Sequence, residues 1–141
     1  MASTLLREHV ALRKLIWVGP LTIAATIIVN LIIRTIAVSI LGVSATFSYL
    51  QAPFIIGSTI IFLLLALLAF VLVNRFARHP IRFYRLLVLV ALCISFLSPV
   101  MALTGLFPAP GMTLAIFWTM IAMHLISAII VISLFTTLAR E

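Results

Sequence analysis

The chain has 141 residues, of which 66% are hydrophobic and 8% are charged, and nine Lys and Arg against two acids give a net charge of +7. A soluble domain is about 45–50% apolar and about 25% charged, so this composition excludes a soluble fold and requires solvation by lipid. The positive charge is therefore interpreted first as a signal of membrane topology, and not of nucleic-acid binding, which needs a basic soluble face.

The first segment, residues 2–17, is short and amphipathic, so its Leu and Ile side chains can face lipid while its basic side chains face headgroups. This pattern predicts an N-terminal interfacial helical segment held by anionic lipid. Because Pro20 cannot donate a backbone hydrogen bond to Ile16, we expect a bend between this segment and the first span. The apolar run is too long for a signal peptide, so the first span should remain in the mature protein.

Four apolar segments follow, and each is long enough to cross about 30 Å of hydrocarbon, which takes about 20 helical residues. Gly42 is suited to end the first span, and Pro53 is suited to the first turn of the second. Pro99 disturbs the third span because it leaves the carbonyl of Ser95 without its helical partner. The expected spans are residues 15–41, 53–73, 81–103 and 112–138.

The links between these spans differ in charge. The links after the first and third spans contain no Lys or Arg, and the first has Phe47 and Tyr49, which suit the aromatic belt of a membrane interface. The link over residues 74–85 is strongly basic, so the positive-inside rule places it and both termini on the cytoplasmic side. The predicted fold class is all-α, with residues 1–141 forming a single transmembrane domain, an antiparallel four-transmembrane-helix bundle.

The arginines of the basic link are expected to contact anionic lipid headgroups, at about 1 kcal/mol for each basic residue near the surface. Their role in setting the topology is sufficient to explain them, and docking of a partner protein is the less favoured alternative. They are Arg75, Arg78, Arg82 and Arg85.

Arg34 is the one charged residue at lipid depth, and no Asp or Glu lies in any span to pair with it. It ends a row of polar residues at i, i+4 spacing, after Thr22, Thr26 and Asn30, and such a row shares one helix face. A guanidinium at the helix centre costs about 2.5–3.5 kcal/mol. Arg34 either reaches outward to lipid phosphates or faces a polar cavity or anionic ligand inside the bundle, and the row favours the inward orientation.

His124 lies near mid-depth in the fourth span. One interpretation is a neutral imidazole that is hydrogen-bonded between helices. The functional alternatives are proton transfer or axial ligation of a haem or pigment. Haem ligation by two histidines of one chain is excluded, because His9 and His79 lie outside the spans.

Several polar residues fall in the outer half of the bilayer or near its centre. They predict an outward-facing pocket that holds a lipid headgroup, a quinone or another small amphiphile. The residues expected to line it are Asn30, Arg34, Ser95, Thr119 and His124.

Templates for catalysis are absent from the sequence. The chain has no paired carboxylates, HExxH, GxSxG or P-loop motif and no carboxylate cluster for a metal, and its single Cys93 excludes an internal disulfide and a CxxC site. We therefore expect a non-enzymatic membrane protein without a cofactor, which binds an amphiphile or serves as an accessory subunit in a homo-oligomer or larger complex. The alternatives are a small oligomeric channel or transporter, and a pigment- or haem-binding subunit that uses His124.

A set of short motifs extends along nearly the whole chain: Asn30 with Arg34, the run Arg78-x-Pro80-x-Arg82-Phe83-x-Arg85, Ser95 with Pro99, and the pair Met123-His124. Together they resemble a bacterial family of small four-span membrane proteins that is catalogued as a domain of unknown function. The resemblance implies the four-helix architecture and a bacterial cytoplasmic membrane, and it implies no activity.

Overall fold

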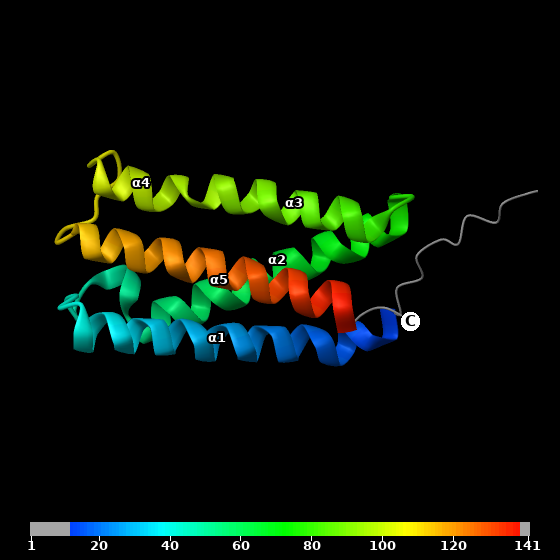
Figure 1. Cartoon of the computed structure of the whole chain (residues 1–141), viewed down its shortest axis with the longest axis horizontal. Helices are drawn as coiled ribbons and strands as arrows, with labels where there is room; N and C mark the ends of the chain where they lie inside the picture. The colour runs from blue at the N-terminus through cyan, green and yellow to red at the C-terminus, as the bar shows by residue number, and fades with distance from the viewer. Residues whose placement is uncertain (1–11, 139–141) are drawn as a thin grey trace, which may run out of the picture.

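The computed structural model describes residues 12–138, so residues 2–11 of the predicted interfacial segment lie outside the described part. Every regular element in that part is helical, with short 3₁₀ turns at Leu12–Lys14 and Ser48–Leu50. Figure 1 shows the longer helices as an elongated bundle. In chain order they are α1 (Leu15–Ile40), α2 (Ala52–Phe76), α3 (Pro80–Ser95), α4 (Leu97–Leu103) and α5 (Leu114–Leu138).

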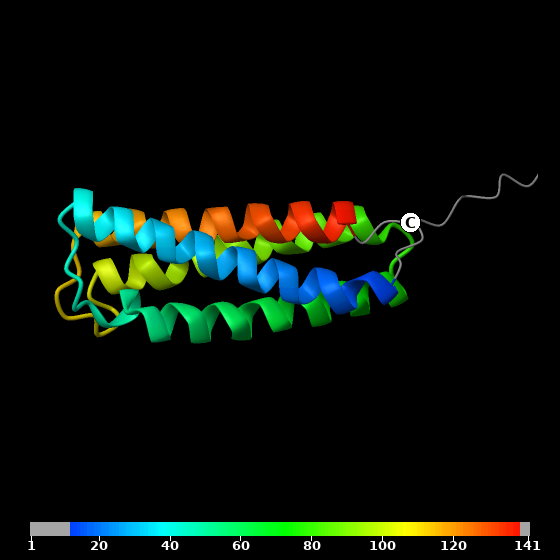
Figure 2. The ribbon, with the colours of Figure 1, turned by 90° about the horizontal axis from the view of Figure 1, so that it is seen from below.

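The helices α3 and α4 together form one span, so residues 12–138 contain four helical spans that are long and apolar enough to cross a membrane. The helix α1 packs against α2 and α5, and α3 packs against the same two helices. Successive spans run in opposite directions (Figures 1 and 2). This arrangement confirms the predicted all-α, antiparallel bundle, in which short links place consecutive spans side by side.

The two ends of the bundle differ in charge. The basic end carries the arginines around the link between α2 and α3, together with Arg13 and Lys14 at the start of α1. The uncharged end is formed by the links over residues 41–51 and 104–113, which contain no Lys or Arg. The link that is predicted to be basic and the links that are predicted to be uncharged therefore lie at opposite ends of one bundle.

The helices at the basic end extend further than the sequence predicts. The helix α2 continues through Arg75 to Phe76, and α3 begins at Pro80. The predicted basic link over residues 74–85 is therefore mostly helix. The physical reason is that Arg has a high helix propensity and that the polar membrane interface accepts charged helix ends, so a run of charge does not by itself end a helix.

The interior of the bundle holds two apolar clusters with a polar layer between them. At the basic end, Phe70, Tyr84 and Phe135 are buried against one another, and the Phe70 and Tyr84 ring centroids lie 4.7 Å apart in an edge-to-face arrangement. At the uncharged end, the second cluster includes the buried side chains of Leu50 and Ile116. Most other large apolar side chains are exposed, which suits a chain whose surrounding solvent is lipid.

The link after α1 folds back over the uncharged end. Gly42 has a φ of 67°, a left-handed conformation that ends α1 as predicted. The prediction that Phe47 belongs to the aromatic belt is wrong, since only 5% of this residue is exposed and it packs in the second apolar cluster. The Tyr49 hydroxyl donates to the Pro108 carbonyl at 3.4 Å, which joins the two links of this end.

Proline interrupts the third span but not the first. The helix α1 runs without a break through Pro20. In the third span, α3 ends at Ser95 and α4 begins at Leu97, with Phe96 in a turn between them. Pro99 has no N–H for the Ser95 carbonyl, as the sequence indicates, so the helical hydrogen-bond ladder is weakened at this position.

Candidate functional site

The polar row of α1 faces the interior of the bundle. Thr22 and Thr26 are 0% exposed and Asn30 is 6% exposed. The Thr22 hydroxyl donates to the Val18 carbonyl, and the Thr26 hydroxyl donates to the Thr22 carbonyl, each at 2.7 Å. Both threonines therefore satisfy their hydroxyls on their own helix, as Thr commonly does inside helices.

Asn30 connects three of the four spans. Its Nδ2 donates to the Ser127 hydroxyl of α5 at 3.2 Å and to the Thr59 hydroxyl of α2 at 3.5 Å. The Ser127 hydroxyl is also 3.4 Å from the Asn30 Oδ1, with a geometry that lets it donate. The amide thus meets its hydrogen-bonding needs inside the protein and forms the polar layer between the two apolar clusters.

Arg34 turns toward the uncharged end and not toward the other polar side chains. Its Nε donates to the Leu50 carbonyl, and its Nη2 donates to the Ala45 carbonyl at 3.5 Å. Both carbonyls belong to the link that folds over the end of the bundle. Two nitrogen atoms of the guanidinium thereby donate to backbone groups of the protein, which connects α1 to this link.

Two other predicted pocket residues, Ser95 and Thr119, use their hydroxyls for hydrogen bonds within their own helices. The Ser95 hydroxyl donates to the Leu92 carbonyl, and the Thr119 hydroxyl donates to the Ala115 carbonyl, at 2.7 and 2.8 Å. His124 packs edge-to-face with Phe96 of the turn between α3 and α4, with ring centroids 6.5 Å apart. No hydrogen bond joins any two of Asn30, Arg34, Ser95, Thr119 and His124.

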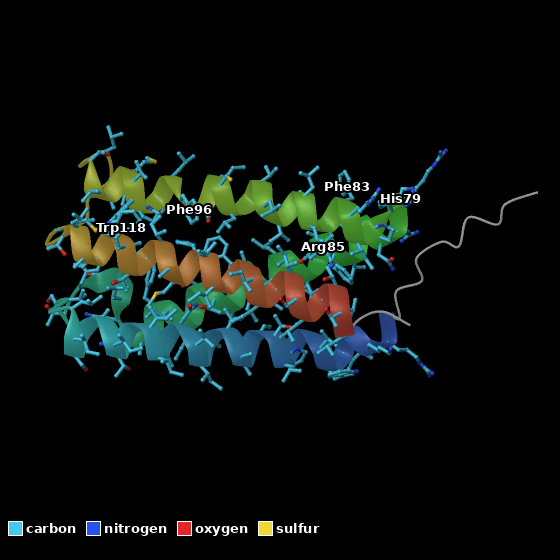
Figure 3. The ribbon with its side chains drawn as sticks, viewed as in Figure 1. His79, Phe83, Arg85, Phe96 and Trp118 are labelled. Carbon is cyan, nitrogen blue, oxygen red and sulfur yellow. The ribbon has the colours of Figure 1, made fainter. Side chains whose placement is uncertain are left out.

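A groove of about 700 Å³ opens instead at the basic end, between the last turns of α2 and the first turns of α3. Apolar atoms form nearly all of its lining, and three basic residues are among the residues that contribute to it. Figure 3 shows two of the lining residues, His79 and Phe83, at the start of α3. The lining residues are Leu72, Val73, Phe76, Ala77, Arg78, His79, Arg82, Phe83 and Leu86.

The structure separates the four arginines that the sequence groups together. Arg78 and Arg82 line the groove. Arg75 lies over the ring of Phe76, with 5.8 Å between the guanidinium carbon and the ring centroid. The Arg85 Nη2 lies 3.4 Å from the Thr136 hydroxyl of α5, to which it donates, and Figure 3 shows Arg85 on the side of α3 that faces α5.

The charges of the groove have no acidic counterpart nearby. The only acids of the chain are Glu8 and Glu141, so residues 12–138 contain none. Arg78, His79 and Arg82 are exposed and have no ion pair within the described residues. A groove of this kind can receive an apolar tail and hold an anionic group at its rim.

Sequence reasoning identified the arginines of the groove but not the groove itself. The available signal was a pair of aromatic residues within the basic run, Phe76 after Arg75 and Phe83 after Arg82, because apolar rings beside basic side chains are suited to a membrane interface. The described residues contain no group of three His, Cys, Asp or Glu side chains that could hold a metal ion.

Comparison with known proteins adds one finding. Residues 10–141 match the Family of unknown function (DUF6069). No curated protein and no solved structure matches the chain. The family match includes all four spans and the whole basic end from Arg13 onward, and this four-span chain therefore belongs to the Family of unknown function (DUF6069).

Proposed function

We propose that this protein is a non-enzymatic integral membrane protein that binds an anionic amphiphile in the groove between α2 and α3. The observation that carries the proposal is the groove at the basic end, which combines apolar walls with the basic residues Arg78, His79 and Arg82. The proposal keeps the amphiphile that the sequence predicts and moves its site from the outer polar pocket to the opposite end of the bundle.

The outer pocket has less support because its strongest members already have protein partners. The Asn30 amide is occupied by Thr59 and Ser127, and the Arg34 guanidinium is occupied by backbone carbonyls of the link after α1. A ligand at either side chain would have to replace these hydrogen bonds. The basic side chains of the groove have no ion pair within the described residues, so a ligand can bind them without replacing such a contact.

The position of the groove also suits a lipid. We propose that the basic end faces the cytoplasm of a bacterial cell, because loops rich in Lys and Arg remain on that side of the cytoplasmic membrane. The rim then lies at the depth of the phosphate groups of the inner leaflet. The walls lie just inside the hydrocarbon, where an acyl chain can follow them.

A channel within one copy of the chain has less support. The polar row of α1 continues toward the basic end into the apolar cluster of Val18, Phe70 and Phe135, which are each buried. The haem alternative rests on His124 alone, whose ring packs against Phe96. The accessory role is compatible with amphiphile binding and needs no separate site.

The proposal is tested by native mass spectrometry of the full chain, released from gentle detergent with its lipids retained. We expect one retained amphiphile per chain, and we expect Phe83→Ala to lower the retained fraction about fivefold through loss of groove wall. The matched control is Phe62→Ala, because Phe62 is 66% exposed on α2 and lies outside the groove, while Phe83 is 53% exposed. Equal retention by both variants, or no retention by the wild type, contradicts the proposal.

A further inference from the structure

We propose that the groove between α2 and α3 selects a lipid whose headgroup is a phosphate monoester, in preference to lipids with a phosphodiester headgroup. The inference rests on the proposed amphiphile binding and adds the chemical class of the ligand. It is carried by the number, the type and the lack of ion pairs of the basic residues that line the groove, which form its basic rim in this proposal.

Two arginines line the groove, so a ligand with a single negative charge would balance only one of the two guanidinium groups. Arg78 and Arg82 each bring a guanidinium to the groove, and His79 stands between them in sequence. None of the three has an ion pair within residues 12–138, which contain no acid. The two neighbouring arginines differ, because Arg75 lies over the Phe76 ring and Arg85 donates to Thr136.

The donors of the rim suit a monoester better than a diester. Each arginine presents a planar fork that can donate two parallel hydrogen bonds to phosphate oxygens. A phosphate monoester carries a charge of about −1.5 to −2 near pH 7 and three strong acceptor oxygens. A diester headgroup carries one negative charge and two such oxygens, so it leaves part of the two forks unused.

The N-terminal end of α3 also contributes positive electrostatic potential through the helix dipole. Pro80 is the first residue of the helix, and its first turn contains no acidic side chain. In the chain, Arg78 comes before Pro80 and Arg82 lies in the first turn of α3 after it, and both line the groove. An anion between them would also lie at the positive end of the α3 dipole, which favours a higher negative charge.

The walls of the groove require that the phosphate belongs to a lipid. Leu72, Phe76 and Leu86 line the groove and are exposed. An acyl chain against these side chains replaces contacts that free inorganic phosphate cannot make. The site therefore requires both parts of the ligand, a phosphate monoester at the rim and an apolar chain along the walls.

The experiment compares three lipids with identical acyl chains, phosphatidic acid, phosphatidylglycerol and phosphatidylcholine, added in equal amounts to the delipidated full chain. Native mass spectrometry reports the fraction of protein that carries each lipid. We expect phosphatidic acid to be retained about tenfold more than phosphatidylglycerol, and phosphatidylcholine least. We expect Arg78→Gln and Arg82→Gln each to reduce this preference to about twofold or less, since each removes one fork.

Arg75→Gln is the matched control, because it removes one positive charge from the same end and Arg75 is not itself a lining residue, although its guanidinium lies over the ring of Phe76, which is one. We expect this variant to keep the preference of the wild type. A thermal unfolding curve of each variant in detergent identifies any that fails to fold, and Arg82→Lys, which keeps the charge and loses the fork, then replaces the glutamine variant. We expect Arg82→Lys to lose most of the preference, and an unchanged preference in it overturns the inference.

The outcomes separate the inference from the proposed function. Equal retention of phosphatidic acid and phosphatidylglycerol overturns the inference and leaves amphiphile binding in place. A loss of preference in Arg75→Gln equal to that in Arg78→Gln also overturns it, because the effect would then follow total charge. Displacement of phosphatidic acid by millimolar inorganic phosphate overturns the requirement for a lipid tail. Retention of no lipid at all contradicts the proposed function itself.

Discussion

Asn30 and Arg34 lie one turn apart on the same face of α1, yet their side chains have different partners. The Asn30 amide bonds side chains of two other spans, and the Arg34 guanidinium donates to two carbonyls of a link. The two side chains differ in length, and this difference explains their different partners. An amide can bond only what lies beside it, whereas the long Arg side chain extends toward the end of the bundle, where non-helical backbone leaves carbonyls available.

We predict that Arg34→Met loosens the link over residues 42–51 without unfolding the helices. Met keeps the apolar stem and removes the two donors to Leu50 and Ala45, so the link loses contacts to a charged donor. Hydrogen exchange of this link, measured by mass spectrometry, should become about tenfold faster, while exchange in α2 and α5 stays as in the wild type.

The control for this prediction is Thr35→Val. Thr35 follows Arg34 in α1, is exposed, and donates its hydroxyl to the Leu31 carbonyl of its own helix. Its removal should leave the link unchanged. Unchanged exchange in Arg34→Met, together with a loss of retained lipid, would instead assign Arg34 to a ligand.

At the scale of elements, the two central spans are joined at the basic end by a very short link. The helices α2 and α3 are separated only by residues 77–79, so their ends must lie side by side. This close joining forms the groove, and Arg78 and His79 of the link are among the residues that line it. The opposite end of the third span is less regular, because α3 and α4 are separated at Phe96.

We predict that Pro99→Ala makes the third span a more continuous helix. The new residue supplies an N–H to the Ser95 carbonyl, which should stabilise the protein by about 1 kcal/mol and slow hydrogen exchange in α4. Pro53→Ala is the control, because Pro53 lies in the first turn of α2, where a missing N–H costs little. A lower stability of Pro99→Ala would show that the packing of α4 on α5 needs the break.

At the scale of the whole molecule, the charge difference between the two ends is the basis of the proposed orientation in a membrane. The basic end contains the arginines of the α2–α3 link and the start of α1, and the uncharged end has no Lys or Arg in either link. Moving the basic end across a bilayer would require the transfer of several charges through hydrocarbon. The orientation set at insertion should therefore persist.

We predict that a membrane-impermeant maleimide reagent labels Leu106→Cys in intact bacterial cells and labels Arg75→Cys only after the membrane is permeabilised. Both variants are made in a Cys93→Ser background, since Cys93 is the only native cysteine. Leu106 is 76% exposed in a link of the uncharged end, and Arg75 is exposed at the basic end. The reverse labelling pattern would contradict the proposed orientation.

The sequence by itself determined the parts of this protein that depend on local composition. Runs of apolar residues predict the four spans because the interior of a bilayer requires every backbone group to bond within its own helix. The i, i+4 row predicts the inward face of Thr22, Thr26 and Asn30, since that spacing is a property of any α-helix. The site residues were less predictable, because polarity alone does not specify which partner a side chain meets.

Only the tertiary structure decided those partners. Asn30 meets Ser127, which lies 97 residues further along the chain, and Arg34 meets a carbonyl 16 residues away in a link that folds back over the bundle. The groove likewise needs two helix ends to lie side by side, and no periodicity in either helix predicts its shape. Hydropathy is a property of each segment, whereas a binding site is a property of how the segments pack.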